Sequence, residues 1–250
     1  MARVTVDGVP AARLAARWGV PQAGVFRALP SVMDAIHELA AQGAPAGTVV
    51  LAEEQAAGRG RDGRTWRSPK GGVWLGLLLR PPGVELAATA IRAGIAVGEA
   101  IDQLVGRPVT RLKWPNDVML DGRKLAGILC EGRWQGGALQ WLALGVGANV
   151  ANVVPPELES RAIALRDVLP EARRLDLLDR LVPGLLRLAT PGAQLSEREL
   201  SAFAARDWLH GRQLARPLFG RAAGIRPDGA LLVEMGAGTV AVRDGHVELA

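Results

Sequence analysis

The chain has 250 residues, of which 49% are hydrophobic and 22% charged, so it is not a disordered chain and can form one substantial domain plus a small appendage. No stretch approaches the roughly 20 consecutive apolar residues of a membrane span, the N-terminus lacks a signal-peptide pattern, and the single cysteine, Cys130, forms no intrachain disulfide, so we expect a cytoplasmic protein. The net charge of +5 suits nucleic acid, nucleotide phosphates or an acidic protein, and does not choose among them.

The first half of the chain predicts alternating helices and strands. Residues 1–28 are weakly patterned, with a short helical stretch at 11–20. Ser31 can cap a helix whose first turn carries Asp34. The other expected elements are strands at 48–52 and 73–79, a polar loop at 53–72, a long buried helix at 86–105, and strand segments at 109–114, 118–120, 124–131 and 140–146, with a hairpin turn at Asp121-Gly122.

The C-terminal part differs in pattern from what precedes it. Residues 171–209 are helical again, with expected interruptions at Pro183 and at Thr190-Pro191-Gly192, and Ser196 with Glu199 offers a capping box. Five short runs separated by Gly and Asp turns (213–217, 222–225, 230–234, 239–242 and 246–249) suggest a small barrel. A domain boundary is therefore expected near residue 210.

The loop from Gln55 to Trp66 is the most informative segment. Its glycines let the backbone approach a ligand closely, its arginines carry planar donor groups, and Trp66 adds a flat apolar face. It is neither a Walker loop nor a Rossmann fingerprint. Taken alone, the pattern fits a phosphate-bearing ligand, a solvated linker or an Arg/Gly nucleic-acid segment.

Two lysines further along the chain are candidate site residues. Lys113 and Asp117 flank Pro115, either as a surface pair or as site residues, and Trp114 is apolar enough for the core. Lys124 begins a strand that otherwise reads as buried, so it needs a carboxylate partner or an anionic ligand unless it reaches solvent at the strand end.

Together these segments resemble the three signatures of the biotin–protein ligases, in the family's order and at similar spacing. The matching segments are Gln55 with Gly58 to Arg61, Gly63, Arg64 and Trp66; Lys113 to Asp117; and Lys124 to Leu129. Ser31 with Asp34, Ser68 to Gly72 and Gly145 to Asn149 add further matches, so the resemblance covers residues 31 to 150.

The resemblance implies an α+β fold, in which a mixed β-sheet flanked by helices, similar to the class II aminoacyl-tRNA synthetase core, precedes a small C-terminal SH3-like β-barrel. The implied division is a short N-terminal extension (1–28), a catalytic domain (29–210) and an SH3-like domain (211–250). The implied reaction converts biotin and ATP to biotinyl-5′-AMP, then transfers biotin to a lysine of a biotin carboxyl carrier domain of a carboxylase. Mg²⁺ is expected with ATP, and its protein ligands are unknown.

The resemblance also implies a role for each matching position. Biotin is expected at Ser31, Val32, Met33, Gln55, Arg59, Gly60, Arg61, Lys124 and Gly127. ATP and the adenylate are expected at Arg59, Arg61, Arg64, Trp66, Lys113, Asn116 and Asn149. The catalytic residues are expected to be Lys124, Arg61, Lys113 and Asp117. Lys124 is the first choice for stabilising the transition state, and Asp117 is a hypothetical base toward the carrier lysine.

Two departures from the family pattern qualify this assignment. Val32 stands where the family usually has threonine, so a side-chain hydrogen bond from that position is absent. Only about 30 residues precede Ser31, which implies a short ligase without the DNA-binding domain of some members, and no DNA partner or membrane contact is expected. The family includes both monomers and homodimers, so a homodimer is one of two expected states.

Two other functions compete with this interpretation. Lipoate ligases and octanoyltransferases share the core, but the chain has no Arg-Arg-x-Ser-Gly-Gly stretch that would match them. A nucleic-acid-binding module would use the Arg/Gly loop and the C-terminal barrel, but it leaves the Lys113 and Lys124 segments unexplained.

Overall fold

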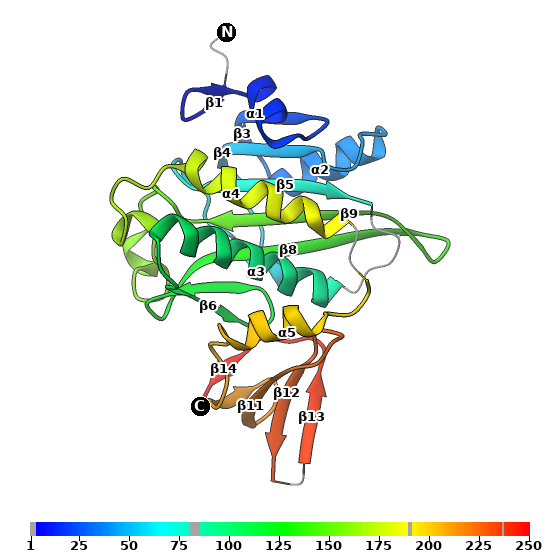
Figure 1. Cartoon of the computed structure of the whole chain (residues 1–250), viewed down its shortest axis with the longest axis vertical. Coiled ribbons are helices and arrows are strands. Elements are labelled where there is room, and N and C mark those ends of the chain that lie inside the picture. Colours follow the sequence, from blue (N-terminus) through cyan, green and yellow to red (C-terminus); the bar gives the residue numbers. More distant parts are fainter. Residues whose placement is uncertain (1–3, 81–85, 190–191, 237) are drawn as a thin grey trace.

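The computed structural model describes residues 4–80, 86–189, 192–236 and 238–250. Its main sheet has seven strands in the order β3-β4-β5-β9-β8-β7-β6, and only β3 and β4 are parallel neighbours, so the predicted mixed sheet is confirmed (Figure 1). The strands are β3 (Ala23–Leu29), β4 (Val49–Gln55), β5 (Val73–Leu79), β6 (Thr110–Lys113), β7 (Asp117–Leu120), β8 (Arg123–Gln135) and β9 (Ala138–Ala148).

Helices cover both faces of this sheet, which explains the continuous apolar run of β5. Leu75, Leu77 and Leu79 belong to the hydrophobic cluster that includes the buried residues of α3 (Leu86–Val105) and α4 (Arg174–Leu186). Trp74 and Leu78, which alternate with them, belong to a second cluster with α2 (Val32–Ala41). Because every residue of β5 is buried, the strand has no polar face.

The N-terminal segment contributes an edge strand that the sequence did not predict. A two-strand ribbon, β1 (Thr5–Val6) and β2 (Val9–Pro10), precedes α1 (Ala11–Trp18), which confirms the helical stretch at 11–20. Residues 23–28, expected to lie in a weakly patterned extension, form most of β3 and pair with β4. None of the residues of β3 is buried, and Gly24 and Arg27 interrupt its apolar residues, so the strand lacks the long apolar run that marks β5.

Helix α4 runs through Pro183, so the predicted interruption at this position is wrong. A proline inside a helix removes one hydrogen bond and costs about 3 kcal/mol or more. Burial of Leu181, Val182 and Leu185 on either side of it offsets this cost. Of the second predicted interruption, Thr190 and Pro191 lie outside the described residues.

The predicted capping box is confirmed at α5 (Glu197–Ala204), where Ser196 and Glu199 bond reciprocally. Four short 3-10 helices complete the helical elements: η1 (Arg61–Gly63), η2 (Pro156–Leu158), η3 (Leu165–Asp167) and η4 (Arg187–Ala189).

The C-terminal residues form a separate five-stranded antiparallel sheet in the order β13-β12-β11-β10-β14. Its strands, β10 (Gln213–Arg216), β11 (Gly220–Ile225), β12 (Leu231–Met235), β13 (Gly238–Val242) and β14 (Glu248–Leu249), confirm the five predicted runs. The described pairings give an open strand order, so the SH3-like barrel stays a prediction.

The C-terminal sheet is attached to the main sheet at the second sequence signature (Figure 1). The indole Nε1 of Trp114, expected in the core, is buried and donates to the carbonyl oxygen of Gly229 at 2.8 Å. The segment before β10 runs beside β6, where Leu112 exchanges backbone hydrogen bonds with Arg206 and Trp208. These contacts bring the last loop of the chain close to the main sheet.

Candidate active site

Residues 58–66, called the flap below, form an ordered loop after β4. Backbone hydrogen bonds join Trp66 N to Gly58 O at 2.8 Å and Gly60 N to Arg64 O at 2.7 Å, and η1 forms the tip. A Cβ on Gly58 would lie 2.5 Å from the carbonyl oxygen of Trp66, so only glycine permits this close approach of the two flap segments.

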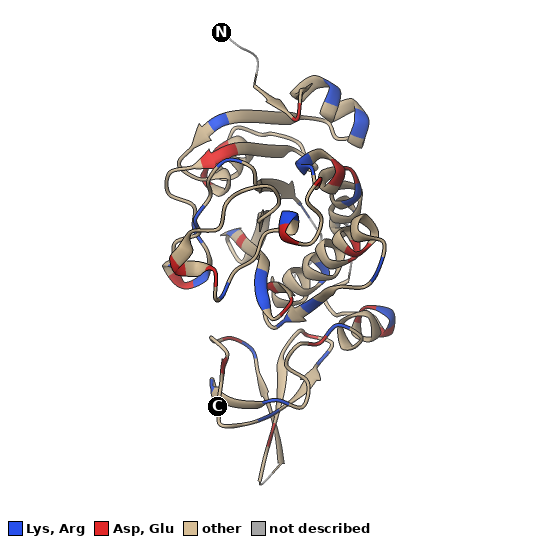
Figure 2. Ribbon diagram, turned by 90° about the vertical axis from the view of Figure 1, so that its left-hand side faces the viewer, with Lys and Arg blue, Asp and Glu red and all other residues tan. Residues whose placement is uncertain are grey.

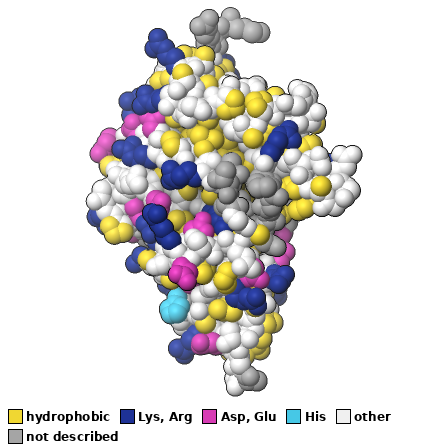
Figure 3. All heavy atoms as spheres, turned by 45° about the vertical axis from the view of Figure 1, so that its right-hand side comes forward, with side chains coloured by type: hydrophobic (Ala, Val, Ile, Leu, Met, Phe, Trp, Pro, Cys, Tyr) yellow, Lys and Arg dark blue, Asp and Glu magenta, His cyan; other side chains and the backbone are white. Residues whose placement is uncertain are grey.

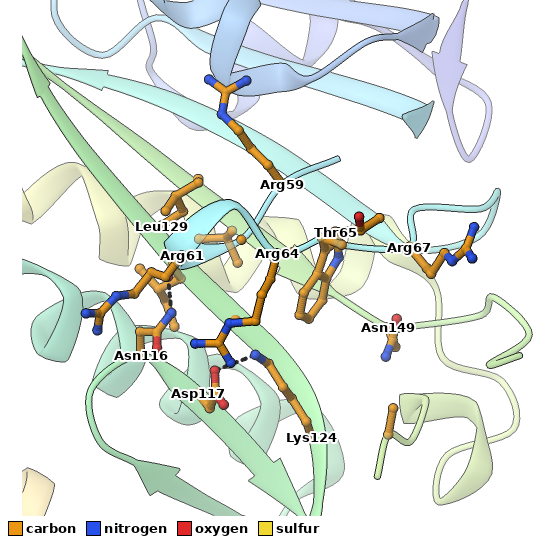
Figure 4. Close-up of a pocket in the computed structure, with 18 of the residues that line it drawn as sticks. Arg59, Arg61, Arg64, Thr65, Arg67, Asn116, Asp117, Lys124, Leu129 and Asn149 are labelled. Carbon is orange, nitrogen blue, oxygen red and sulfur yellow. Dashed lines mark hydrogen bonds and ion pairs between the residues drawn. The ribbon is translucent and has the colours of Figure 1, made fainter. Parts of the chain in front are cut away.

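The flap borders a cavity of about 510 Å³ that all the predicted site residues line, some of which are labelled in Figure 4. The predicted residues that line it are Ser31, Val32, Met33, Gln55, Arg59, Gly60, Arg61, Arg64, Trp66, Lys113, Asn116, Asp117, Lys124, Gly127 and Asn149. Three segments that are distant in sequence therefore share one cavity. Their positions alone do not identify which ligand each residue contacts.

The N-terminus of α2 closes one end of the cavity. Ser31 caps the helix by accepting a hydrogen bond from Met33 N at 3.2 Å. Gln55 accepts from Val32 N at 2.8 Å and donates to Ser68 Oγ at 2.7 Å, so its amide joins the helix to the segment after the flap. The side chain of Val32 is buried, as suits an apolar residue.

Lys124 has the carboxylate partner that its position in a buried strand requires. Its Nζ lies 2.5 Å from Oδ1 of Asp117 and 4.9 Å from the centre of the Trp66 ring. A Cβ on Gly127 would come within 3.1 Å of Trp66 and 3.3 Å of Lys124 Nζ, so the glycine provides space for both side chains. In Figure 4 Lys124, Asp117 and Arg64 point toward one another.

Lys113 lies on the same side of the cavity, with Nζ 5.4 Å from the ring centre of Trp208. Burial lowers the pKa of Lys113 most; Asp117 counteracts this, and the neighbouring Lys124 lowers the pKa further. Lys113 therefore places a second cationic side chain close to Lys124. Burial and Lys124 together disfavour the protonated form of Lys113.

Two predicted asparagines have structural hydrogen bonds. Asn116 Nδ2 donates to Ile128 O at 2.7 Å, which ties the turn after β6 to β8. Asn149 Nδ2 donates to Ile163 O at 3.2 Å, and its Oδ1 accepts from Asn152 at 3.1 Å. Both residues line the cavity, but these amide groups already order the loops around it.

The three flap arginines point in different directions. Arg59 is directed away from the others toward α2 (Figure 4). Arg61 pairs with Asp244, and Arg64 pairs with Asp62 at 2.9 Å and contacts His246 Nδ1 at 3.2 Å. The loop between β13 and β14 therefore supplies residues to one wall of the cavity.

Several lining residues were missed by the sequence interpretation. They include Asn152, Arg161, Trp208 and His246. Arg161 follows η2 in a loop without regular pattern, and His246 belongs to a terminal run that reads only as a strand. Burial lowers the pKa of His246 below 6.5, and the cations Arg64 and Lys113 lower it further. A weak signal for His246 exists, since three histidines occur in the whole chain, but nothing in the sequence places it opposite the flap.

Basic residues are mixed with acidic ones along the described part of the chain. Figure 2 shows Lys and Arg interspersed with Asp and Glu along the ribbon, and the face in Figure 3 also mixes basic, acidic and hydrophobic side chains. A nucleic-acid surface is expected to show a basic stripe or patch. No described helix is long and apolar enough to cross a membrane.

Comparison with known proteins identifies the family. Residues 25–149 match the model of the biotin/lipoate A/B protein ligase family. The chain is 33% identical over 238 residues to the bifunctional ligase/repressor BirA of Bacillus subtilis, covering 88% of this chain and 72% of that protein. It is 35% identical over 211 residues to a biotin–[acetyl-CoA-carboxylase] ligase of Paracoccus denitrificans, covering 76% of this chain and 85% of that protein.

The fold comparison agrees with this result. The structure of the biotin protein ligase from Aquifex aeolicus in complex with biotin and ATP superposes with a TM-score of 0.79 at 24% identity, covering 92% of this chain and 99% of that one. Sequence and fold give the same assignment: the chain is a ligase of the biotin/lipoate A/B protein ligase family and belongs to its biotin–protein ligase group.

Proposed function

We propose that the protein activates biotin with ATP and transfers it to one lysine of a biotin carboxyl carrier domain of a carboxylase. The observation that carries this proposal is the single cavity shared by the α2 N-terminus, the flap and Lys124. The similarity to named biotin–[acetyl-CoA-carboxylase] ligases supports the choice of substrate and carrier.

The proposed chemistry has two steps. In the first, an oxygen of the biotin carboxylate attacks the α-phosphorus of ATP, the bond to the β-phosphate breaks, and biotinyl-5′-AMP and pyrophosphate result. In the second, the carrier amine attacks the biotinyl carbonyl carbon, loses a proton, and AMP leaves. The first step brings two anionic groups together, the biotin carboxylate and the triphosphate, so positive charge at that centre is its main requirement.

The cavity residues fit these needs in the following way. Lys124 contacts the carboxylate and phosphate oxygens and stabilises the transition state of the first step. Arg61 and Arg64 bind phosphate oxygens as the flap closes, and Trp66 packs near the adenine. Asp117, beside Lys124, accepts the proton of the carrier amine in the second step. Lys113, Asn116 and Asn149 bound the nucleotide end, and Ser31, Val32, Met33, Gln55, Gly60 and Gly127 bound biotin.

Magnesium enters as part of the MgATP substrate in this scheme. The described residues contain no group of three or more His, Cys, Asp or Glu side chains that could hold a resident ion. Mg²⁺ usually keeps several waters and binds through substrate phosphates, so the protein need not supply a full ligand set.

The remaining expectations extend the proposal to domains and location. We assign catalysis to a domain of residues 29–210, to which β3 adds its edge strand, and describe residues 211–250 as an SH3-like domain that completes the cavity wall with His246. We place the reaction in the cytoplasm, in line with a chain whose one cysteine, Cys130, is free. DNA binding has no part in the proposed function.

A reconstituted reaction tests the proposal. The purified protein is incubated with biotin, ATP, Mg²⁺ and an unmodified carrier domain, and the carrier mass is measured. One added biotinyl group on one lysine is the expected result, and omission of ATP is the control. Lipoate replaces biotin in a parallel reaction and in a thermal-shift comparison. Modification by lipoate but not biotin would place the protein in the lipoate branch and refute the proposal.

A further inference from the structure

Arg59 belongs to the flap, but its guanidinium lies outside the group of cations around Lys124 (Figure 4). Its Nε and NH2 donate to the two carboxylate oxygens of Glu131 on β8, each at 3.2 Å. Its NH1 donates to Asp34 Oδ1 in the first turn of α2 at 2.5 Å. Each of the three guanidinium nitrogens therefore has a carboxylate partner. We propose that Arg59 is a positioning residue that anchors the flap to α2 and β8, and that it does not bind the substrate phosphate.

Glu131 is itself held in place by two further side chains. Trp141 Nε1 donates to His37 Nδ1 at 2.9 Å, and an indole nitrogen can only donate. His37 therefore accepts at Nδ1 and carries its proton on Nε2, which lies 2.9 Å from Glu131 Oε2 and donates to it. The neutral tautomer of His37 is fixed by Trp141, and the carboxylate of Glu131 is oriented toward Arg59.

The charges of this cluster support a permanent contact. Burial alone would raise the pKa of Glu131, but hydrogen bonds from Arg59 and His37 outweigh it and lower the pKa below its ordinary value. The bond to Glu131 also raises the pKa of Arg59. The side chains of Arg59 and Glu131 are 32% and 30% exposed, so this paired contact is screened less than a fully exposed surface pair.

The anchor joins the flap to the helix that borders the other end of the cavity. Asp34 and His37 both belong to α2, whose first turn also contains Val32, and Val32 N bonds to Gln55 at the end of β4. The flap is thus fixed to α2 through Arg59, and the end of β4 that precedes it is fixed to α2 through Gln55. A phosphate contact by Arg59 would require it to leave both carboxylates, whereas an anchored Arg59 keeps the flap ordered before ATP enters.

A proteolysis experiment tests the anchor without reference to the reaction. Trypsin cleaves after Arg61 and Arg64, within the flap, and mass spectrometry follows both cuts in protein without added biotin or ATP. Glu131→Gln and Arg59→Lys are each expected to accelerate these cuts about tenfold, the effect of losing charge-assisted hydrogen bonds. The matched control is Glu38→Gln, which removes an exposed carboxylate beside His37 on the same helix. Equal cleavage rates in all four proteins, at equal melting temperatures, would overturn the anchor.

A kinetic experiment, which rests on the proposed function, distinguishes anchoring by Arg59 from phosphate binding by Arg59. Adenylate formation is followed by pyrophosphate release in Arg59→Lys, Glu131→Gln and the double variant. Because Arg59 acts through Glu131, both single variants are expected to raise the KM for biotin by a similar factor, and the double variant is expected to add nothing. A much larger defect in Arg59→Lys, with multiplicative losses in the double variant, would show that Arg59 binds substrate directly. If no variant, nor the unsubstituted protein, forms an adenylate, the proposed function fails while the proteolysis result still decides the anchor.

Discussion

Replacement of Lys124 by methionine removes one positive charge and keeps a chain of similar length against Trp66. In the structure Lys124 Nζ is 2.5 Å from Asp117, and 31% of the side chain is exposed. At a contact distance of about 4 Å and an effective dielectric constant of about 20, one unit charge contributes about 4 kcal/mol, close to a thousandfold in rate. Partial exposure weakens this contribution, so we expect Lys124→Met to slow adenylate formation by about 100-fold to 1,000-fold.

The assay must separate this effect from damage to Asp117, which loses its partner in the variant. Single-turnover formation of biotinyl-5′-AMP, measured at saturating biotin and ATP, reports the first step alone. The double variant Lys124→Met/Asp117→Asn removes the unpaired carboxylate and serves as the control. Recovery of the rate in the double variant, or a loss smaller than about tenfold in folded Lys124→Met, would refute transition-state stabilisation by Lys124.

Three other substitutions examine the cavity walls. His246→Gln is expected to flatten the pH dependence of the KM for ATP on the acid side of 6.5, because the pKa of His246 is lowered from that value. Burial and cations such as Arg64 hold the pKa of His246 below 6.5, so the neutral ring accepts from Arg64 at pH 7. The ring loses this contact as the pH falls through the lowered pKa. If the KM for ATP rises at acid pH in His246→Gln as much as in the unsubstituted protein, this role is contradicted. Gly147→Ala places Cβ 2.6 Å from Trp66 Nε1 and should raise the KM for ATP by displacing the indole, unless Trp66 is remote from the adenine. Asp117→Ala should slow transfer from preformed adenylate to the carrier, and a normal transfer rate constant would exclude its role as base.

Local patterns predicted most elements because their signals are written in neighbouring residues. The residues of α3 and β5 have the apolar spacing of a buried helix and a buried strand, and the Asp121-Gly122 turn joins β7 to β8 as expected. The interruption expected at Pro183 was wrong, and β3 was missed, because neither outcome is determined by neighbouring residues. The packing of α4 in the core tolerates the proline, and β3 is a strand only because β4 lies beside it, so both depend on residues far away in the sequence.

In the candidate site too, some features were predictable from the sequence and others were not. The family resemblance of the ordered motifs predicted that Lys124 and the flap belong to one site, and they line one cavity. The direction of a long side chain was not predictable. Arg59 and Arg61 are two residues apart in a Gly-Arg-Gly-Arg sequence and look equivalent, yet their partners are Glu131 on β8 and Asp244 in the loop between β13 and β14.

Exposure of the partner carboxylates sorts the flap arginines by how readily they can change partners. Asp244 and Asp62, which pair with Arg61 and Arg64, are 78% and 56% exposed. Surface pairs of this kind contribute little, so a phosphate can replace either carboxylate at small cost. Glu131 is 30% exposed and also bonded to His37, so Arg59 exchanges less readily. The same loop therefore combines one fixed cation with two exchangeable ones, which suits the proposed function, in which the flap stays attached to α2 while its tip closes over a nucleotide.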